Sequence, residues 1–466
     1  MKLFSAACAL LSFFLGAAAR GADRPNVLLI ISDDLRDFGG AFTKEVVRTP
    51  SLDRLRQRGL TFTRAYAQYP VCNPSRVSLL TGWRPEQSGV VGNQQFFREA
   101  LPDAVTLPEL LRAHGYTTRS YGKVLHTANT GEARREAWSD LGRSWDVAEE
   151  FAVRPPGDRG PRRQLGGGQL PWCEVGAMEG SDDDQPDGQT AAAAIASIEQ
   201  LSAAGKPWLV AAGFHRPHDP FLVRAAYFEL YPNKSLRLHR DPAGLSPSAP
   251  LAFSAKWIEP FAAFSEDDRR DFLQAYLAGV SFMDAQVGRL LAVLDRRQLW
   301  EKTLVIFLGD HGYHLGERGW WNKHTLFERS CRAPLILAGA GVPQGAVAPG
   351  LVEFIDLYPT VAEVCGFKPP PGLPGRSLRP LLARPAAPHR ESAFSLVSRD
   401  GGWGRSLRTE QWRYNRWSDG VRELYAHPSD EEEEHNVAGD PALAGTVAAL
   451  EAQLKAAPAW PPASAK

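Results

Sequence analysis

The chain has 466 residues, of which 44% are hydrophobic and 23% charged, a composition that excludes a disordered, collagen-like or coiled-coil protein. Its 53 Lys and Arg residues balance 53 Asp and Glu residues. Because there is no basic excess, neither a nucleic acid nor an anionic membrane is the expected partner. The length favours several domains, or one large α/β domain with a smaller appendage.

The N-terminus has the layout of a secretory signal peptide. Lys2 supplies a positive charge, residues 3–19 form a short apolar run, and small residues allow cleavage after Ala19 or Ala22. We therefore expect residues 1–22 to be removed and the mature protein to be secreted or periplasmic. No later segment approaches about 18 consecutive apolar residues, so no membrane span is expected after cleavage.

Four apolar segments are predicted to be buried parallel strands, because they lack the polar alternation of a half-buried strand. They are residues 26–31, 117–121, 208–212 and 303–308. Helical patterns lie between and after them, at residues 51–58, 107–114, 189–203, 269–297 and 354–365. This order predicts an α/β fold with a large, doubly wound and mostly parallel sheet.

Composition also marks the domain organisation. Residues 127–187 are rich in Gly, Arg, Asp and Pro, and we expect a long surface insertion there. A Pro/Gly run at 368–375 ends the catalytic domain, which is predicted to span residues 23–375. Residues 376–466 are predicted to form a small C-terminal α+β subdomain with an antiparallel sheet. Its expected elements are strands 391–397, 404–408 and 412–417, a solvated acidic loop at 430–434, and a helix at 438–456.

Reactive side chains follow each predicted parallel strand. They are Asp33 and Asp34 after the first, Lys123 and His126 after the second, His215 and His218 after the third, and Asp310 and His311 after the fourth. In open α/β sheets, ligands bind outside the carboxyl ends of the strands. The sequence therefore predicts a functional site at that edge of the sheet.

Asp33, Asp34, Asp310 and His311 would surround one divalent cation. Oxygen-rich ligation favours a hard ion, and Ca²⁺ tolerates irregular geometry better than Mg²⁺. Without a cation, clustered carboxylates would raise one another's pKa. Asp33 and Asp34 alone could equally cap a helix. The nearby lysines and histidines indicate an anionic substrate beside the metal.

A further segment reads Cys72-Asn73-Pro74-Ser75-Arg76 and ends in Leu80-Thr81-Gly82. Pro74 fits the first turn of a helix, which places Cys72 just ahead of that turn, where backbone N–H groups favour anions. Cys72 could there be a thiolate nucleophile. A buried apolar cysteine is an equally good interpretation of this residue alone.

The pattern Cys-x-Pro-Ser-Arg followed by Leu-Thr-Gly resembles the signature of type I sulfatases, in the alkaline phosphatase superfamily. The resemblance covers nearly the whole mature chain, since the other motifs occur in the family's order: Asp33-Asp34, Gly122-Lys123, His126, His215, Asp310-His311 and Lys323. Residues 185–189, 214–218 and 310–323 are most similar to the iduronate-2-sulfatase branch. That branch carries His at the position of His311, where other sulfatases commonly have Asn.

The resemblance implies a mechanism. A formylglycine-generating or equivalent maturation enzyme would oxidise Cys72 to Cα-formylglycine, whose hydrate attacks the sulfur of a sulfate ester. One Ca²⁺ would be held by an oxygen of modified Cys72 together with Asp33, Asp34, Asp310 and His311. Arg76, Lys123 and His126 would orient the hydrate, with His126 as a candidate base. Lys323 and His215 would bind the sulfate, and either could protonate the leaving alcohol.

The expected substrate is a sulfated glycan, because the chain is predicted to be exported and holds 13 Trp residues. Arg318, Trp320 and Trp321 precede Lys323 and are candidate sugar contacts, with core packing as an equal alternative. His218 is either a substrate contact or a structural histidine. Two other functions remain open: a phosphodiesterase or phosphonate hydrolase of the same superfamily, and an inactive glycan-binding relative. The sequence leaves the oligomeric state open.

Four cysteines follow the predicted signal peptide: Cys72, Cys173, Cys331 and Cys365. This number is small for an exported protein, so disulfides are not expected to brace the fold. Cys365 is expected to be a small buried hydrophobe, and Cys173 to lie in the exposed insertion.

Overall fold

The computed structural model describes residues 24–38, 47–127, 137–427 and 429–461. The predicted signal peptide and its cleavage point lie outside these residues. Among the described residues, one helix is long and apolar enough to cross a membrane, α10 (Glu266–Arg296). Its most apolar stretch is 78% buried inside the protein, as in the core helix of a globular domain.

The centre of the fold is an eight-stranded sheet in the order β11-β2-β10-β9-β1-β7-β3-β4. Four neighbouring strands, β9 (Thr303–Gly309), β1 (Asn26–Asp33), β7 (Trp208–Pro217) and β3 (Thr117–Gly122), pair in parallel. These are the four strands predicted from the sequence, and their carboxyl ends meet at one edge. The other strands are β2 (Gly59–Tyr66), β4 (Val147–Glu149), β10 (Leu335–Gly339) and β11 (Ala346–Glu353).

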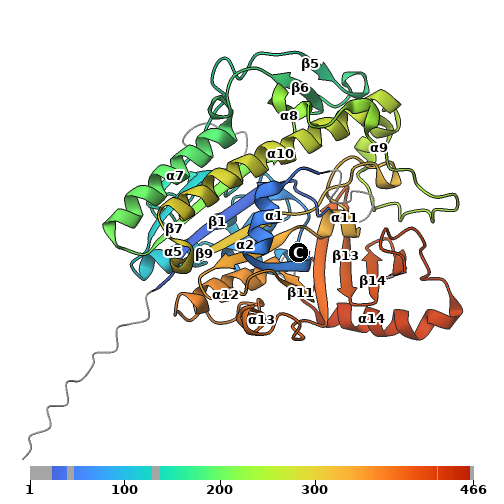
Figure 1. Cartoon of the computed structure of the whole chain (residues 1–466). Helices are drawn as coiled ribbons and strands as arrows, with labels where there is room; N and C mark the ends of the chain where they lie inside the picture. The colour runs from blue at the N-terminus through green and yellow to red at the C-terminus, as the bar shows by residue number, and fades with distance from the viewer. Residues whose placement is uncertain (1–23, 39–46, 128–136, 428, 462–466) are drawn as a thin grey trace, which may run out of the picture.

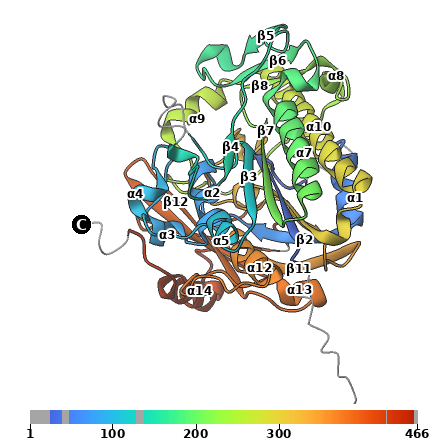
Figure 2. The ribbon, with the colours of Figure 1, turned by 90° about the vertical axis from the view of Figure 1, so that its left-hand side faces the viewer.

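Helices cover both faces of this sheet (Figures 1 and 2). Leu28 and Ile30 of β1 belong to the core shared with α1 (Pro50–Gln57), α7 (Pro186–Ala204) and α10. Val27, Leu29 and Ile31 belong to the core shared with α2 (Cys72–Thr81), α5 (Leu107–Ala113) and α12 (Leu357–Val364). Because successive side chains of a strand point to opposite faces, a continuous apolar run is what a two-sided core requires. The predicted α/β fold is confirmed.

The C-terminal region forms a four-stranded antiparallel sheet with a closing helix, at the lower right of Figure 1. It consists of β12 (Ser392–Arg399), β13 (Gly402–Thr409), β14 (Trp412–Trp417), β15 (Arg422–Ala426) and α14 (Ala444–Ala456). The sequence prediction missed β15. The prediction of a solvated acidic loop is wrong for Glu433, which is fully buried against arginines that are distant in sequence.

The expectation of a surface insertion at 127–187 is only partly correct. β4 joins the edge of the main sheet, and β5 (Arg162–Gln164) and β6 (Glu174–Met178) build a small sheet with β8 (Phe221–Arg224). Leu165, Leu170 and Cys173 are buried in the core beside α10. The described part of this segment is therefore largely packed against the rest of the protein, and Cys173 is buried, contrary to expectation.

The remaining helices are short: α3 (Pro85–Ser88), α4 (Phe97–Ala100), α8 (Ala225–Phe228), α9 (Ala255–Ala262), α11 (Glu328–Cys331) and α13 (Arg379–Ala383). Cys72, Cys173, Cys331 and Cys365 are all free and buried. The prediction that disulfides do not brace the fold is therefore confirmed for these four cysteines.

Candidate active site

The carboxyl edge of the parallel sheet gathers the predicted site residues. Asp33 ends β1 and Asp34 follows it, Asp310 and His311 follow β9, and Lys123 follows β3. Cys72 and Arg76 come from α2, and Lys323 comes from the loop before α11. Direct contacts described below join these residues into one cluster. The three histidines at 126, 215 and 218 are partly exposed, whereas the acidic centre of the cluster is buried, so the histidines lie on its accessible side.

Close backbone contacts shape this edge. A Cβ on Gly213 would lie 2.1 Å from the carbonyl oxygen of Lys123, so only glycine lets the ends of β7 and β3 approach this closely. Asp34 has a φ of 61°, in the left-handed region that a non-glycine residue rarely occupies. Its backbone N–H donates to Oδ1 of Asp310 at 3.1 Å, which holds the strained turn in place.

The acidic centre has the donors that a divalent cation needs. Ligand atoms of Asp33, Cys72, Asp310 and His311 lie within 4.8 Å of one another, and Asp34 belongs to an overlapping group. His311 Nδ1 lies 2.9 Å from the carbonyl oxygen of Gly312, which assigns the proton to Nδ1 and leaves Nε2 as an acceptor. Among the described residues, neither His311 Nε2 nor Asp34 Oδ2 has a hydrogen-bond partner. Buried acceptors without donors fit a cation at this position.

Charge interactions support the same interpretation. Burial, with help from Asp33 and Cys72, raises the pKa of Asp34 to about 7. Burial alone would lower the pKa of His311, but Asp310 and Cys72 raise it to about 9. Without a metal Nε2 would therefore carry a proton near neutral pH, and a bound cation would take the place of that proton. The site thus favours additional positive charge, which a proton supplies weakly and a divalent cation would supply fully.

Cys72 begins α2 instead of preceding it, one residue from the predicted position. Its side chain is fully buried, with Sγ 3.1 Å from Lys323 Nζ and 4.0 Å from Asp34 Oδ1. Both the helix N-terminus and the ammonium group favour negative charge on an atom at this position.

Three cations flank the carboxylates. Arg76 lies one turn after Cys72 in α2, and its Nε donates to Asp310 Oδ2 at 2.9 Å while Nη2 lies 3.4 Å from Asp33 Oδ1. Lys123 pairs with Asp33, and Lys323 pairs with Asp34. Burial would raise the pKa of Asp33, but Lys123 and the other cations hold it well below its ordinary value.

The histidines are held neutral. Burial, together with the charge of Lys123, lowers the pKa of both His126 and His215 to about 3. Burial and the charges of Lys323 and Lys123 also lower the pKa of His218 well below its ordinary value. Its Nε2 lies 3.8 Å from Asp34 Oδ2. A neutral imidazole offers one N–H donor and one nitrogen acceptor, so these side chains are suited to hydrogen-bond an anionic group or a hydroxyl.

Sequence reasoning missed Asp187. This buried carboxylate in the first turn of α7 accepts the backbone N–H groups of His215 at 2.8 Å and Arg216 at 2.9 Å. It therefore fixes the irregular end of β7, where the pairing with β1 shifts register. An aspartate just after Pro186 at a helix start would have been the available signal.

The structure corrects the predicted sugar contacts. Trp320 and Trp321 are each 2% exposed and pack among aromatic rings, Trp320 against Phe261 and Trp321 against Phe272. Arg318 donates to the carbonyl oxygen of Ser246 and stacks over a buried ring. The two tryptophans therefore fill the core and offer no surface to a saccharide, whereas Arg318 joins chain segments and stays partly exposed.

Comparisons with known proteins agree with this geometry. The sulfatase family model matches residues 25–367, and a model described as the C-terminal region of N-sulphoglucosamine sulphohydrolase matches residues 316–459. Human iduronate 2-sulfatase is 32% identical over 404 residues, which cover 78% of this chain and 72% of that protein. A sulfatase of Formosa agariphila is 30% identical over 456 residues, covering 93% and 86%.

Among solved structures, a phosphonate monoester hydrolase from Silicibacter pomeroyi aligns with a TM-score of 0.75 at 25% identity, covering 93% of this chain and 94% of that one. This similarity reflects a shared superfamily fold, whereas the family match and the sulfatase relatives define the branch. The chain belongs to the sulfatase family: it is a sulfuric ester hydrolase of type I, in the alkaline phosphatase superfamily, and resembles iduronate-2-sulfatases.

Proposed function

We propose that this protein is an exported sulfatase that hydrolyses a sulfate ester on a glycan, with Cys72 oxidised to formylglycine and one bound Ca²⁺. The observation that carries the proposal is the position of Cys72. It begins a buried helix, faces Lys323 Nζ at 3.1 Å, and adjoins carboxylate and imidazole acceptors that lack donors. An anionic reacting centre and a cation both fit this arrangement.

Asp33, Asp34, Asp310 and His311, with an oxygen of the modified residue 72, would hold the cation. Carboxylate oxygens favour a hard ion, and the irregular arrangement around the strained Asp34 turn favours Ca²⁺ over Mg²⁺. The ion would neutralise the clustered carboxylates and make a nearby hydroxyl more acidic. The formylglycine hydrate would supply the nucleophilic oxygen and, by returning to the aldehyde, the means to expel sulfate.

The residues of this chain orient and bind. Arg76 and Lys123 each pair with Asp33 and keep the metal-binding carboxylates in position. His126, neutral at physiological pH, is the proposed base for the hydroxyl at residue 72. Lys323 and His215 would bind sulfate oxygens. Either could protonate the leaving alcohol, and Lys323 is the one that already holds a proton, since Asp34 raises its pKa despite burial.

The substrate class follows from the relatives. The name of the human relative, iduronate 2-sulfatase, contains that of a sugar acid, and this supports a sulfated saccharide as the substrate of this protein. The similarity to the S. pomeroyi hydrolase supports a phosphonate ester as the second candidate substrate. A catalytically inactive glycan-binding protein is opposed by the complete set of polar residues around Cys72.

The same proposal includes maturation and export. A formylglycine-generating or equivalent enzyme would act on Cys72, and residues 1–22 would be removed during secretion. Residues 23–375 would form the catalytic domain and residues 376–466 the C-terminal subdomain. The two family matches overlap at residues 316–367. The hydrogen bond from the backbone N–H of Glu328 to Glu433 would help to hold the subdomain on the catalytic domain.

The test combines peptide mass spectrometry with parallel rate measurements on a sulfate ester, a phosphate diester and a phosphonate ester. Residue 72 should be an aldehyde, the sulfate ester should react fastest, and Cys72→Ala should abolish turnover. Cys365→Ala, a cysteine buried away from the site, is the matched control and should keep activity. A fully active protein with an unmodified thiol at Cys72 would disprove the mechanism, and a faster phosphonate reaction would favour the second candidate.

A further inference from the structure

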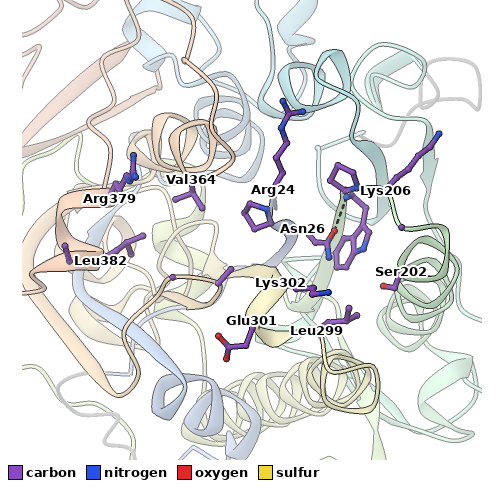
Figure 3. Close-up of a pocket in the computed structure, with 17 residues that line it drawn as sticks. Arg24, Asn26, Ser202, Lys206, Leu299, Glu301, Lys302, Val364, Arg379 and Leu382 are labelled. Carbon is purple, nitrogen blue, oxygen red and sulfur yellow. Dashed lines mark hydrogen bonds between the residues drawn. The ribbon is translucent and has the colours of Figure 1, made fainter. Parts of the chain in front are cut away.

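A pocket lies at the end of the parallel sheet opposite the candidate active site (Figure 3). Its volume is about 980 Å³, and its lining includes Asn26 at the start of β1, Trp208 at the start of β7 and Lys302 just before β9. We call it the basal pocket. Asn26 and Asp33 are the two ends of β1, so the basal pocket and the acidic centre are separated by about 23 Å along the strand.

The lining of the basal pocket is cationic. Arg24, Lys206, Lys302 and Arg379 come from four separate segments, and Glu301 is the one acidic side chain among the lining residues. Lys206, Lys302 and Arg379 are exposed and form no ion pair with any described part of the chain. The whole chain has zero net charge. This local excess is therefore a distinct feature of one surface, and it attracts anions.

Two polar atoms in the lining lack partners. Trp208 is fully buried, yet its Nε1–H has no hydrogen-bond acceptor among the described residues. The Ser202 hydroxyl, on the last turn of α7, is also without a partner in the described chain. A buried donor without an acceptor is destabilising by about 1–3 kcal/mol. Both atoms are covered by the surrounding protein, so an oxygen-rich anion would pair first with the exposed lysines and would satisfy these two donors where the lining opens to it.

We propose that the basal pocket binds a sulfated segment of a glycan, remote from the ester that is cleaved. A sulfate group has only acceptor oxygens, which match a lining of N–H, O–H and ammonium donors. The volume lies within the range of small-ligand sites and admits sugar units as well as the sulfate. A nucleic acid is disfavoured because the chain as a whole has no basic excess.

This inference rests on the proposed function for its class of ligand and adds a role for chain length. The basal pocket would hold one part of a long sulfated saccharide while another part of the same saccharide, or a second saccharide, reaches the catalytic edge. A small sulfate ester would not benefit. The basal pocket should therefore change the affinity for oligosaccharides without changing turnover of small substrates.

The experiment measures binding of a heparin-derived octasaccharide by calorimetry, in the Cys72→Ala background so that no turnover occurs. Lys206→Glu with Lys302→Glu should weaken or remove one class of binding site by about tenfold or more at low ionic strength. The matched control is Lys234→Glu with Arg237→Glu, an exposed pair on another surface with the same change in charge. Ser202→Ala removes an unpartnered hydroxyl without changing charge and should weaken binding by about twofold to fivefold.

Three results would overturn the proposal. The first is that the pocket variant and the control variant bind the octasaccharide equally. The others are that the protein binds inorganic sulfate alone, or a DNA strand of matched charge, as tightly as it binds the octasaccharide. With Cys72 intact, the pocket variant should hydrolyse a small sulfate ester at the unchanged rate. Melting temperatures within the range of the control would exclude misfolding as the cause. If the protein proves not to be a sulfatase, the binding measurement still reports on the basal pocket, so the two failures are distinguishable.

Discussion

Within the part of the chain that the structure describes, two clusters of carboxylates and histidine are buried, and they differ in one respect. The first is the acidic centre at the edge of the sheet, around Asp310 and His311. The second joins Glu328 of α11 to His427 and Glu433 of the C-terminal region. In each cluster the ligand atoms lie within 4.8 Å of one another, so the residue types and spacing alone would suggest two metal sites.

The second cluster is already neutralised by arginine. Arg413 pairs with both Glu328 and Glu433, and Arg332 lies 3.1 Å from Glu328 Oε1. His427 Nε2 lies 2.9 Å from Glu433 Oε1, and every carboxylate oxygen of the two glutamates has a hydrogen-bond partner. In the first cluster, Asp34 Oδ2 and His311 Nε2 have none within the described chain. Unpartnered acceptors, and not the number of acidic residues, distinguish a candidate metal site from a structural ion network.

The largest effect is expected from a substitution in the first cluster. Asp310→Asn removes a charged ligand from the cation and also unpairs Arg76, which it contacts at 2.9 Å. We expect turnover to fall by about 10³-fold or more, equivalent to roughly 4 kcal/mol, together with a lower Ca²⁺ affinity. Elemental analysis and calorimetry on the purified protein measure the metal, and steady-state kinetics measures turnover.

Asp53→Asn, on the surface of α1, is the matched control and should change neither quantity. Chelation of the wild-type protein should likewise abolish activity, and added Ca²⁺ should restore it. Activity that survives complete removal of metal would show that the unpartnered acceptors have another role.

A smaller effect is expected from the second cluster. Glu328→Gln keeps the side-chain shape but leaves Arg408 and Arg413 buried without their full counter-charge. The expected loss in the free energy of unfolding is about 3–5 kcal/mol, because removing one member of a buried ion network exposes the desolvation penalty of the others. Metal content should stay unchanged. Denaturant unfolding and elemental analysis of the same sample test both points.

The control for this variant is Glu410→Gln. Glu410 is 79% exposed and pairs with Arg64 at 3.2 Å, so its loss should change stability by about 1 kcal/mol or less. If Glu328→Gln removed bound metal, the two clusters would not differ in the way the geometry indicates.

The same contrast explains which features could be predicted from the sequence. The first cluster was predictable because its residues follow apolar strands, and the carboxyl ends of parallel strands meet at one edge. The second was not, since Glu433 and Arg413 meet Glu328 only through folding of segments about eighty to one hundred residues apart. An acidic run without counter-charges beside it in sequence therefore predicts a solvated loop.

Burial of polar and aromatic side chains was the other feature that the sequence could not supply. Trp320 and Trp321 lie close to Lys323 in sequence, but their rings turn into the core with Phe261 and Phe272. Asp187 was missed because its place after Pro186 indicates only a helix start, and its partners are backbone N–H groups of β7, which no pattern of side chains reveals. Both errors concern the direction of a side chain, whereas strand order follows from apolar runs alone.

The smallest expected effect concerns a histidine that neither cluster includes. His314 is buried, with Nε2 2.9 Å from Thr325 Oγ1, and burial lowers its pKa to about 3 although Glu317 opposes the shift. The unfolded chain therefore binds a proton below about pH 6.5 that the folded protein does not, so stability falls as pH falls. Between pH 7 and pH 5 this histidine should account for a loss of about 2 kcal/mol. In His314→Gln that part of the loss should vanish, measured as the free energy of unfolding at both pH values. An unchanged pH dependence in the variant would mean that His314 gains a proton within the fold, most simply by sharing it with Glu317. His314 and Glu317 would then form a charged pair, like those of the second cluster, and not a carboxylate beside a neutral imidazole.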